Sequence, residues 1–106
     1  MNAGQKSDEE LTAYLAERAM GWKVTPDRFI KSGRSWIPRW RFQPLNDIAD
    51  ALDLLNRAAN WFTLVSSLKK VVTAEVNVAG HRGKASGKQI ARTITIAVAR
   101  ALGLDV

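Results

Sequence analysis

The chain contains no cysteine and a single histidine, His81, in 106 residues. The lack of cysteine excludes disulfides and cysteine-ligated zinc, and one histidine leaves few of the nucleophile–base pairs that hydrolases use. No apolar run approaches the roughly 20 residues that span a membrane, and residues 1–10 are polar and acidic, unlike a signal peptide. We therefore expect a cytoplasmic protein that is not an enzyme and holds no cofactor and no metal.

Positive charge is the main excess in the composition. The chain has 16 lysines and arginines against 10 acidic residues, which gives a formal net charge of +6. Most cations fall in two regions, 23–41 and 69–100, and each of these regions contains one acid, Asp27 or Glu75. This distribution favours an anionic partner, although a solvated surface without a specific ligand has the same composition.

Capping and glycine signals predict the first helix. Ser7 and Glu10 have the spacing of a capping box, in which a hydroxyl binds the free amide of the first turn. Apolar residues then recur at helical spacing, and Gly21 can adopt the left-handed conformation that ends a helix. We expect a helix over about 8–20.

The second predicted helix begins after Pro44, which disfavours helical geometry in the residue before it. Asn46 or Asp47 can cap this helix. Asp50 and Asp53 follow, and we interpret these acids as complements of the helix dipole rather than as metal ligands. The expected apolar stripe consists of Ile48, Ala51, Leu52, Leu55, Ala58 and Ala59.

The third predicted helix covers about 87–102 and ends before Gly103. Its expected apolar face consists of Ile90, Ile94, Ala97, Val98 and Ala101. We expect Lys88, Arg92 and Thr95 on the opposite, solvated face.

Strand patterns lie between these helices. Residues 22–24 and 28–30 are expected to form short strands, joined to the following segment by a turn over 32–35. Residues 36–42 contain Pro38, so they are expected to form an edge strand or an ordered loop, with Trp36, Pro38, Trp40 and Phe42 on one side. Residues 61–65 and 71–78 are rich in strand formers, and the lysine pair between them marks a hairpin tip or a strand start.

The segment from Gly80 to Gly87 is predicted to be a basic loop before the last helix. Glycines and a helix N-terminus suit a phosphate, because backbone amides there are free to bind an anion. The candidate ligand-binding residues here are His81, Arg82, Lys84, Lys88 and Arg92. A solvated connection from strand to helix is the alternative interpretation of the same segment.

Aromatic residues supply a second candidate site. A base can stack on an exposed tryptophan while an arginine holds its phosphate. We expect Trp22 and Trp61 to be mainly buried, as aromatic residues usually are. The candidate ligand-binding residues here are Trp36, Arg39, Trp40 and Arg41.

The expected organisation is a flexible tail over 1–7 and a single α+β domain over 8–106. A small antiparallel sheet covered by helices is the simplest way to bury every apolar stripe. A chain of this size buries about two-thirds of its unfolded surface, so a partner subunit can add stability and we expect a homo-oligomer.

Three segments resemble one known family. They are the helix end at 19–22, the run from Trp40 to Ala51, and the alanine-rich helix from Ile90 to Leu102 that follows two strands. In these features the chain resembles the phage ABA sandwich domain, a three-layer α/β/α fold of small phage proteins. The likeness covers most of 11–102, but Leu45-Asn46 replaces the usual Ser or Thr cap and the basic loop has no counterpart. The resemblance implies fold and phage origin, and it implies no site residues.

Charge, aromatics and the phage resemblance together suggest a function. We expect a counter-defence protein that sequesters an anionic nucleotide-type signal in the host bacterial cytoplasm. One alternative is a phage accessory protein that binds nucleic acid through the same cations. Another alternative is an inhibitor that binds a host protein.

Overall fold

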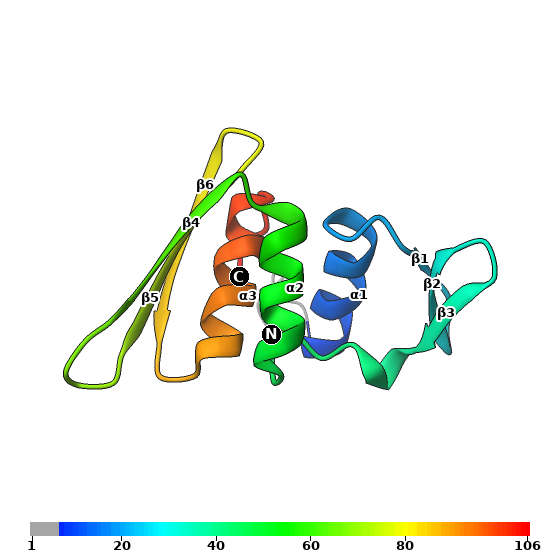
Figure 1. Cartoon of the computed structure of the whole chain (residues 1–106), viewed down its shortest axis with the longest axis horizontal. Coiled ribbons are helices and arrows are strands. Elements are labelled where there is room, and N and C mark those ends of the chain that lie inside the picture. Colours follow the sequence, from blue (N-terminus) through cyan, green and yellow to red (C-terminus); the bar gives the residue numbers. More distant parts are fainter. Residues whose placement is uncertain (1–6) are drawn as a thin grey trace.

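The computed structural model of the chain describes residues 7–106 (Figure 1). The predicted flexible tail lies outside these residues, apart from Ser7. The elements in order are α1 Asp8–Arg18, β1 Lys23–Val24, β2 Arg28–Ser32, β3 Ser35–Pro38, the 3-10 turn η1 Arg39–Arg41, α2 Ile48–Ala58, β4 Trp61–Ser66, β5 Val72–Val78, β6 His81–Gly87 and α3 Ile90–Ala101. The predicted α+β class is therefore confirmed. Within the described residues, no helix combines the length and apolar character needed to cross a membrane.

Two antiparallel three-stranded sheets, β1-β2-β3 and β4-β5-β6, lie on opposite sides of the three helices (Figure 1). The predicted arrangement, one sheet with helices as outer layers, is not confirmed, because here the helices are in the middle. The reason lies in the pattern of β5. Val72, Ala74 and Val76 are buried, Ala74 and Val76 in the core shared with the helices, whereas Thr73 and Glu75 are only half-buried on the other face. One apolar face needs only one covering layer.

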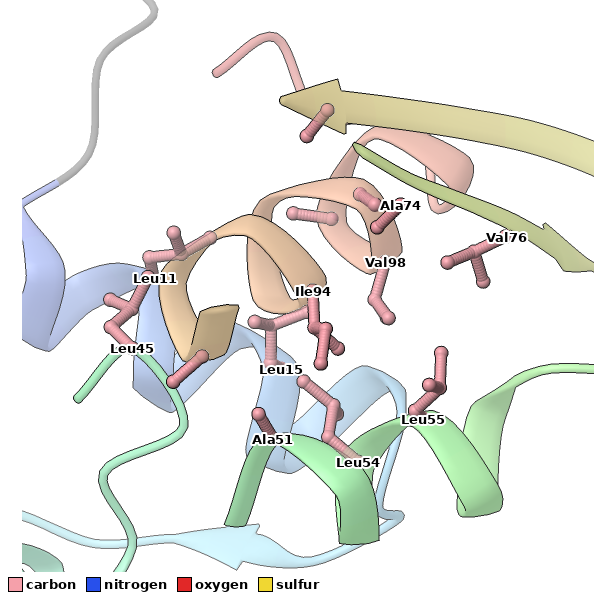
Figure 2. Packing of buried hydrophobic residues seen from close by; sticks show 14 residues of the cluster. Leu11, Leu15, Leu45, Ala51, Leu54, Leu55, Ala74, Val76, Ile94 and Val98 are labelled. Atoms are coloured by element: carbon pink, nitrogen blue, oxygen red, sulfur yellow. The ribbon is translucent and has the colours of Figure 1, made fainter. Parts of the chain in front are cut away.

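The main core joins all three helices to the β4-β5-β6 sheet. Helix α3 packs against β5, β6 and α2, and Figure 2 shows Ile94 and Val98 of α3 directed toward leucines of the other two helices. The largest apolar side chains of the cluster are Leu11, Leu15, Leu45, Leu54, Leu55, Val76, Ile94 and Val98. A smaller cluster of Ala16, Phe29 and Phe42 lies beneath the β1-β2-β3 sheet.

The predicted start of α1 is confirmed, and its end differs slightly. The Ser7 hydroxyl accepts a hydrogen bond from the Glu10 amide at 3.1 Å, as the capping pattern indicates. The helix ends at Arg18, two residues before the predicted end, and Gly21 follows with a φ of +73°. This left-handed conformation is accessible to glycine at little cost.

Helix α2 is capped as expected, and its apolar stripe was predicted correctly at Ala51 and Leu55 but not at Ile48 and Leu52. The Asp47 carboxylate accepts hydrogen bonds from the first-turn amides of Ala49 and Asp50. Ile48 and Leu52 are 48% and 36% exposed. Leu54, which the predicted stripe omitted, is fully buried. Because α2 packs against α3, its buried face consists of Ala51, Leu54 and Leu55 and is turned away from Ile48 and Leu52, which the prediction included.

Helix α3 begins at Ile90, three residues later than predicted. Two side chains on it were assigned to the wrong environment: Ile90 is 41% exposed and Thr95 is fully buried. The Thr95 hydroxyl donates a 2.7 Å hydrogen bond to the main-chain oxygen of Pro44. Burial of this polar side chain is possible because its hydroxyl is satisfied by a neighbouring loop.

The predicted basic loop over 80–87 is wrong, since residues His81–Gly87 form strand β6 paired antiparallel with β5. The turn that joins the strands is tight, with positive φ at Ala79 and Gly80. Along β6, Gly83 and Ala85 are buried and their neighbours are exposed. The strand alternation is therefore present, but small residues at the buried positions concealed it from a hydrophobicity pattern.

Gly83 is the point at which β6 approaches α3 most tightly. A Cβ atom at this position would overlap the main-chain oxygen of Ala97 and crowd the amide and Cβ of Ala101. The small residue is therefore required for contact between strand and helix.

The remaining strands agree with the sequence. Strands β1, β2, β4 and β5 are confirmed. Lys70, with a φ of +61°, lies at the β4–β5 hairpin tip. Strand β3 is an edge strand that stops at Pro38, and the chain then turns through η1. Trp40 and Phe42 were predicted to lie on one side of an extended segment, and this prediction is wrong because of the turn. Trp40 is 69% exposed, whereas Phe42 is buried.

Candidate functional site

A cationic pocket of ≈ 500 Å³ lies where β6 ends and α3 begins. We call it the α3 pocket, and its volume is within the range of small-molecule sites. It is lined by Ala85, Ser86, Gly87, Lys88, Gln89, Arg92, Thr93, Ile96, Arg100 and Val106. Three of the described lining residues are cations and none carries a carboxylate side chain.

Arg100 is held over the pocket by the main chain. Its Nη1 donates a 2.8 Å hydrogen bond to the main-chain oxygen of Lys84, and its Nε donates a 3.0 Å hydrogen bond to that of Val106. Within residues 7–106, no carboxylate side chain forms an ion pair with Arg100 or with Lys88. Arg100 thus uses two of its N–H groups on main-chain oxygens, and neither it nor Lys88 is neutralised by an acidic side chain of the described residues.

Arg92 is already paired. Its guanidinium forms two 3.0 Å hydrogen bonds with the Asp8 carboxylate at the start of α1. The hydrogen bond from Arg92 lowers the pKa of Asp8, and the same bond raises the pKa of Arg92. Both side chains remain about half exposed, so a ligand in the pocket would have to share Arg92 with Asp8.

The start of α3 lacks the cap that the other two helices have. Ser7 caps α1 and Asp47 caps α2, but no side chain of residues 7–106 caps α3 at Gln89. The first turn of α3 also contains no acid. Free amides and the positive end of the helix dipole therefore meet Lys88 at one end of the pocket, an arrangement that suits a phosphate or carboxylate.

Only two of the five residues predicted around the basic segment line this pocket, namely Lys88 and Arg92. His81, Arg82 and Lys84 lie on β6, whose main chain pairs with β5 and so provides no backbone nest for an anion. Lys84 contributes its carbonyl oxygen rather than its ammonium group to the surroundings of Arg100.

Arg82 belongs to a different surface, the open face of the sheet. Its Nη1 lies 3.7 Å from a carboxylate oxygen of Glu75, and its guanidinium lies 5.5 Å from the ring centre of Trp61. Trp61 is 41% exposed, so the prediction that it is mainly buried is wrong. It pairs with Asn77 of β5 and so lies on the face of the sheet that points away from the helices. Trp22, by contrast, is half-buried and packs against Phe29 and Phe42 with ring centres 6.0 and 5.0 Å away.

Arg100 was not among the predicted binding residues. The available signal was helical spacing, because Arg92, Ile96 and Arg100 recur every four residues and so share one face of α3. The prediction placed the binding residues before the helix, whereas the pocket extends along its first three turns.

The aromatic candidate site lies at the other end of the molecule, on β3 and η1 (Figure 1). The structure therefore does not bring it together with the α3 pocket. Trp36 is 48% exposed, and the guanidinium of Arg28 lies 4.1 Å from its ring centre. Arg41 lies 5.9 Å from the ring centre of Trp40, while Arg39 lies over Phe29 at 5.5 Å.

Acids accompany the cations at this end. Arg39 and Trp40 line a pocket of ≈ 450 Å³ that also contains Glu9 and Asp27. Arg41 lines another, of ≈ 460 Å³, with Asp50 and Asp53. Burial raises the pKa of Asp50. These mixed charges suit an anion less well than the α3 pocket does. Among residues 7–106, no three potential metal ligands come together.

Two comparisons with known proteins bear on the fold, and a third gives nothing. The sequence profile of the phage ABA sandwich domain matches residues 13–101. A crystal structure of a phage protein from Bacillus cereus superposes with a TM-score of 0.76 at 15% identity, covering 100% of this chain and 96% of the other. No curated protein matches the sequence. The profile match extends over most of the chain, which therefore belongs to the phage ABA sandwich domain family.

Proposed function

We propose that this small phage protein binds an anionic, nucleotide-type ligand in the α3 pocket and acts in counter-defence by sequestering it in the host bacterial cytoplasm. The observation that carries the proposal is the pocket itself, whose lining combines three cations and an uncapped helix start with no carboxylate side chain. Membership of a phage family supports a role during infection.

The pocket offers complementary groups to each part of a nucleotide. A phosphate at the start of α3 would receive amide hydrogen bonds and the charge of Lys88. Arg100, fixed by two main-chain oxygens, presents a preorganised guanidinium to a second phosphate. Ile96 and Ala85 provide apolar contact for a sugar or base. The proposed complex is reversible, and the ligand leaves chemically unchanged.

Calorimetric titration tests this proposal. We expect mono- and dinucleotides to bind and the matching nucleosides, which lack phosphate, to bind at least about tenfold more weakly. Lys88→Gln should weaken nucleotide binding, whereas the control Lys69→Gln, which removes the same charge near the β4–β5 hairpin tip, should not. Equal affinities for nucleotide and nucleoside, or equal effects of the two variants, would contradict the proposal.

The open face of the β4-β5-β6 sheet favours a second candidate, binding of nucleic acid. Arg82 and Lys84 are exposed there, Arg82 beside the ring of Trp61, and cations with an aromatic platform are typical of single-strand binding. This function predicts a steep loss of affinity with salt, because several phosphate contacts release counterions. It also predicts sensitivity to Arg82→Gln rather than to Lys88→Gln.

A further inference from the structure

Strand β4 is unusual because it is uncharged and all six of its residues, Trp61–Ser66, are exposed. Its register with β5 runs without a break from Trp61 opposite Asn77 to Ser66 opposite Val72. The other long edge of β4 is unpaired among the described residues. It therefore presents a straight row of main-chain donors and acceptors to its surroundings.

Neither face of β4 is covered. Phe62 and Leu64 pair with Val76 and Ala74, which places them on the helix side of the sheet. They nevertheless remain 42% and 38% exposed, because α3 packs chiefly on β5 and β6. On the outer face, Val65 is 58% exposed. The strand thus exposes apolar side chains in both directions.

The two outer edges of this sheet differ in charge. Strand β6 carries Arg82 and Lys84, and cations on an edge strand discourage pairing with another chain. Strand β4 has no charge, no proline and no bulge between Trp61 and Ser66. Natural sheets normally protect an exposed edge by at least one of these devices. The absence of all three from β4 leaves this edge open to pairing with a further strand.

We propose that β4 pairs antiparallel with β4 of a second copy of this chain, which joins the two three-stranded sheets into one continuous sheet. A twofold axis at Thr63 keeps both helix layers on the same side. In this register Thr63 faces its own copy, Phe62 faces Leu64 of the second copy, and Trp61 faces Val65 of the second copy. Aromatic–aliphatic pairs of this kind stabilise adjacent strands.

Charge favours β4 over β6 as the edge through which two copies of this chain meet. The chain carries a net charge of +6, so two copies repel each other unless they meet where no cations lie. Pairing of β6 with β6 would bring Arg82 and Lys84 of both copies together. Pairing of β4 with β4 brings together only uncharged residues, and twofold symmetry closes the assembly at two chains.

The size of this contact sets its strength. One six-residue strand with partly exposed side chains buries less than the about 800 Å² per partner of a standard interface. We therefore expect a dimer that dissociates on dilution. Since the α3 pocket lies beside β6, at the other edge of the sheet, the proposed dimer leaves both pockets open. The proposal is thus independent of ligand binding.

Sedimentation velocity across the micromolar concentration range tests the proposal. We expect the mass to rise from that of the 11.7 kDa chain toward twice that value. Leu64→Lys should raise the dissociation constant by at least about tenfold. In the proposed register each lysine then faces Phe62 of the second copy, and β4 has no acid to pair with it. The matched control is Leu68→Lys, which places the same change at a fully exposed residue outside β4.

A rescue experiment separates a lost interface from a lost fold. Leu64→Lys and Leu64→Glu should each be monomeric, and a mixture of the two should form a heterodimer through opposite charges. Circular dichroism of each variant checks that the sheet is intact. A monomer throughout the concentration range, or equal weakening by Leu64→Lys and Leu68→Lys, would overturn the proposal.

Discussion

The guanidinium of Arg92 on α3 holds the carboxylate of Asp8, at the start of α1, through two 3.0 Å hydrogen bonds across 84 positions of sequence. The pair connects the first described helix to the last one. It also places one acid beside the otherwise cationic α3 pocket. Two predictions follow from this position, one for stability and one for binding.

The first prediction concerns pH. The pKa of Asp8 is lowered in the folded protein by Arg92, so the pair contributes stability above the ordinary value of 3.8 and loses that contribution as the pH falls through the lower folded value. Asp8→Asn should cost at most about 1 kcal/mol at pH 7, as is usual for exposed pairs. Urea unfolding should show this difference shrinking below pH 3.8. Glu9→Gln is the control, and a difference independent of pH would contradict the assignment.

The second prediction concerns the ligand. Asp8→Asn removes the acid that competes for Arg92 and should therefore increase the affinity of the α3 pocket for a nucleotide, by a factor of about 2–10. Titration of wild type and variant with the same nucleotide measures the change. Unchanged affinity would mean that Arg92 does not contact the ligand.

The third prediction concerns the approach of β6 to α3. Gly83→Ala introduces a methyl group where Ala97 and Ala101 already lie in contact, and strand and helix must separate to accept it. We expect a loss of about 3 kcal/mol, the upper end for overpacking, in thermal or urea unfolding. Lys84→Ala, at the exposed neighbouring position, should change stability by less than about 0.5 kcal/mol. A Gly83→Ala protein of wild-type stability would contradict the close approach.

The fourth prediction concerns the buried hydroxyl of Thr95. Thr95→Val keeps the shape of the side chain but leaves the main-chain oxygen of Pro44 without its donor. The expected loss is about 1–3 kcal/mol. Thr95→Ser retains the hydroxyl and removes a methyl group, so its comparison in the same unfolding assay separates the hydrogen bond from packing. A larger loss in Thr95→Ser would assign the role of this residue to packing instead.

Local signals in the sequence predicted the helices well because their causes are local. Ser7 and Asp47 cap helices through amides only two or three positions away, and Gly21 ends α1 by its own conformational freedom. The strands at 61–65 and 71–78 were found for a similar reason, since Val72, Ala74 and Val76 alternate with half-buried residues.

The errors arose where distant residues decide the structure. Strand β6 was predicted as a loop because its buried positions carry Gly83 and Ala85, which have low strand propensity. These small residues are there because the strand lies close against α3. Thr95 was placed on the solvated face because its partner, Pro44, is 51 positions away. Of the residues predicted around the basic segment, Lys88 and Arg92 line the α3 pocket, and Arg100 joins them through the packing of α3 against β6; their role in binding stays a prediction.

The separation of the two sheets by the helices has a consequence for local unfolding. The β1-β2-β3 sheet rests on a cluster of three buried residues, Ala16, Phe29 and Phe42, apart from the main core. This end can open while the helices and β5 keep their packing. In native-state hydrogen exchange, amides of β2 should therefore exchange through a sub-global opening, and those of β5 only when the whole chain unfolds.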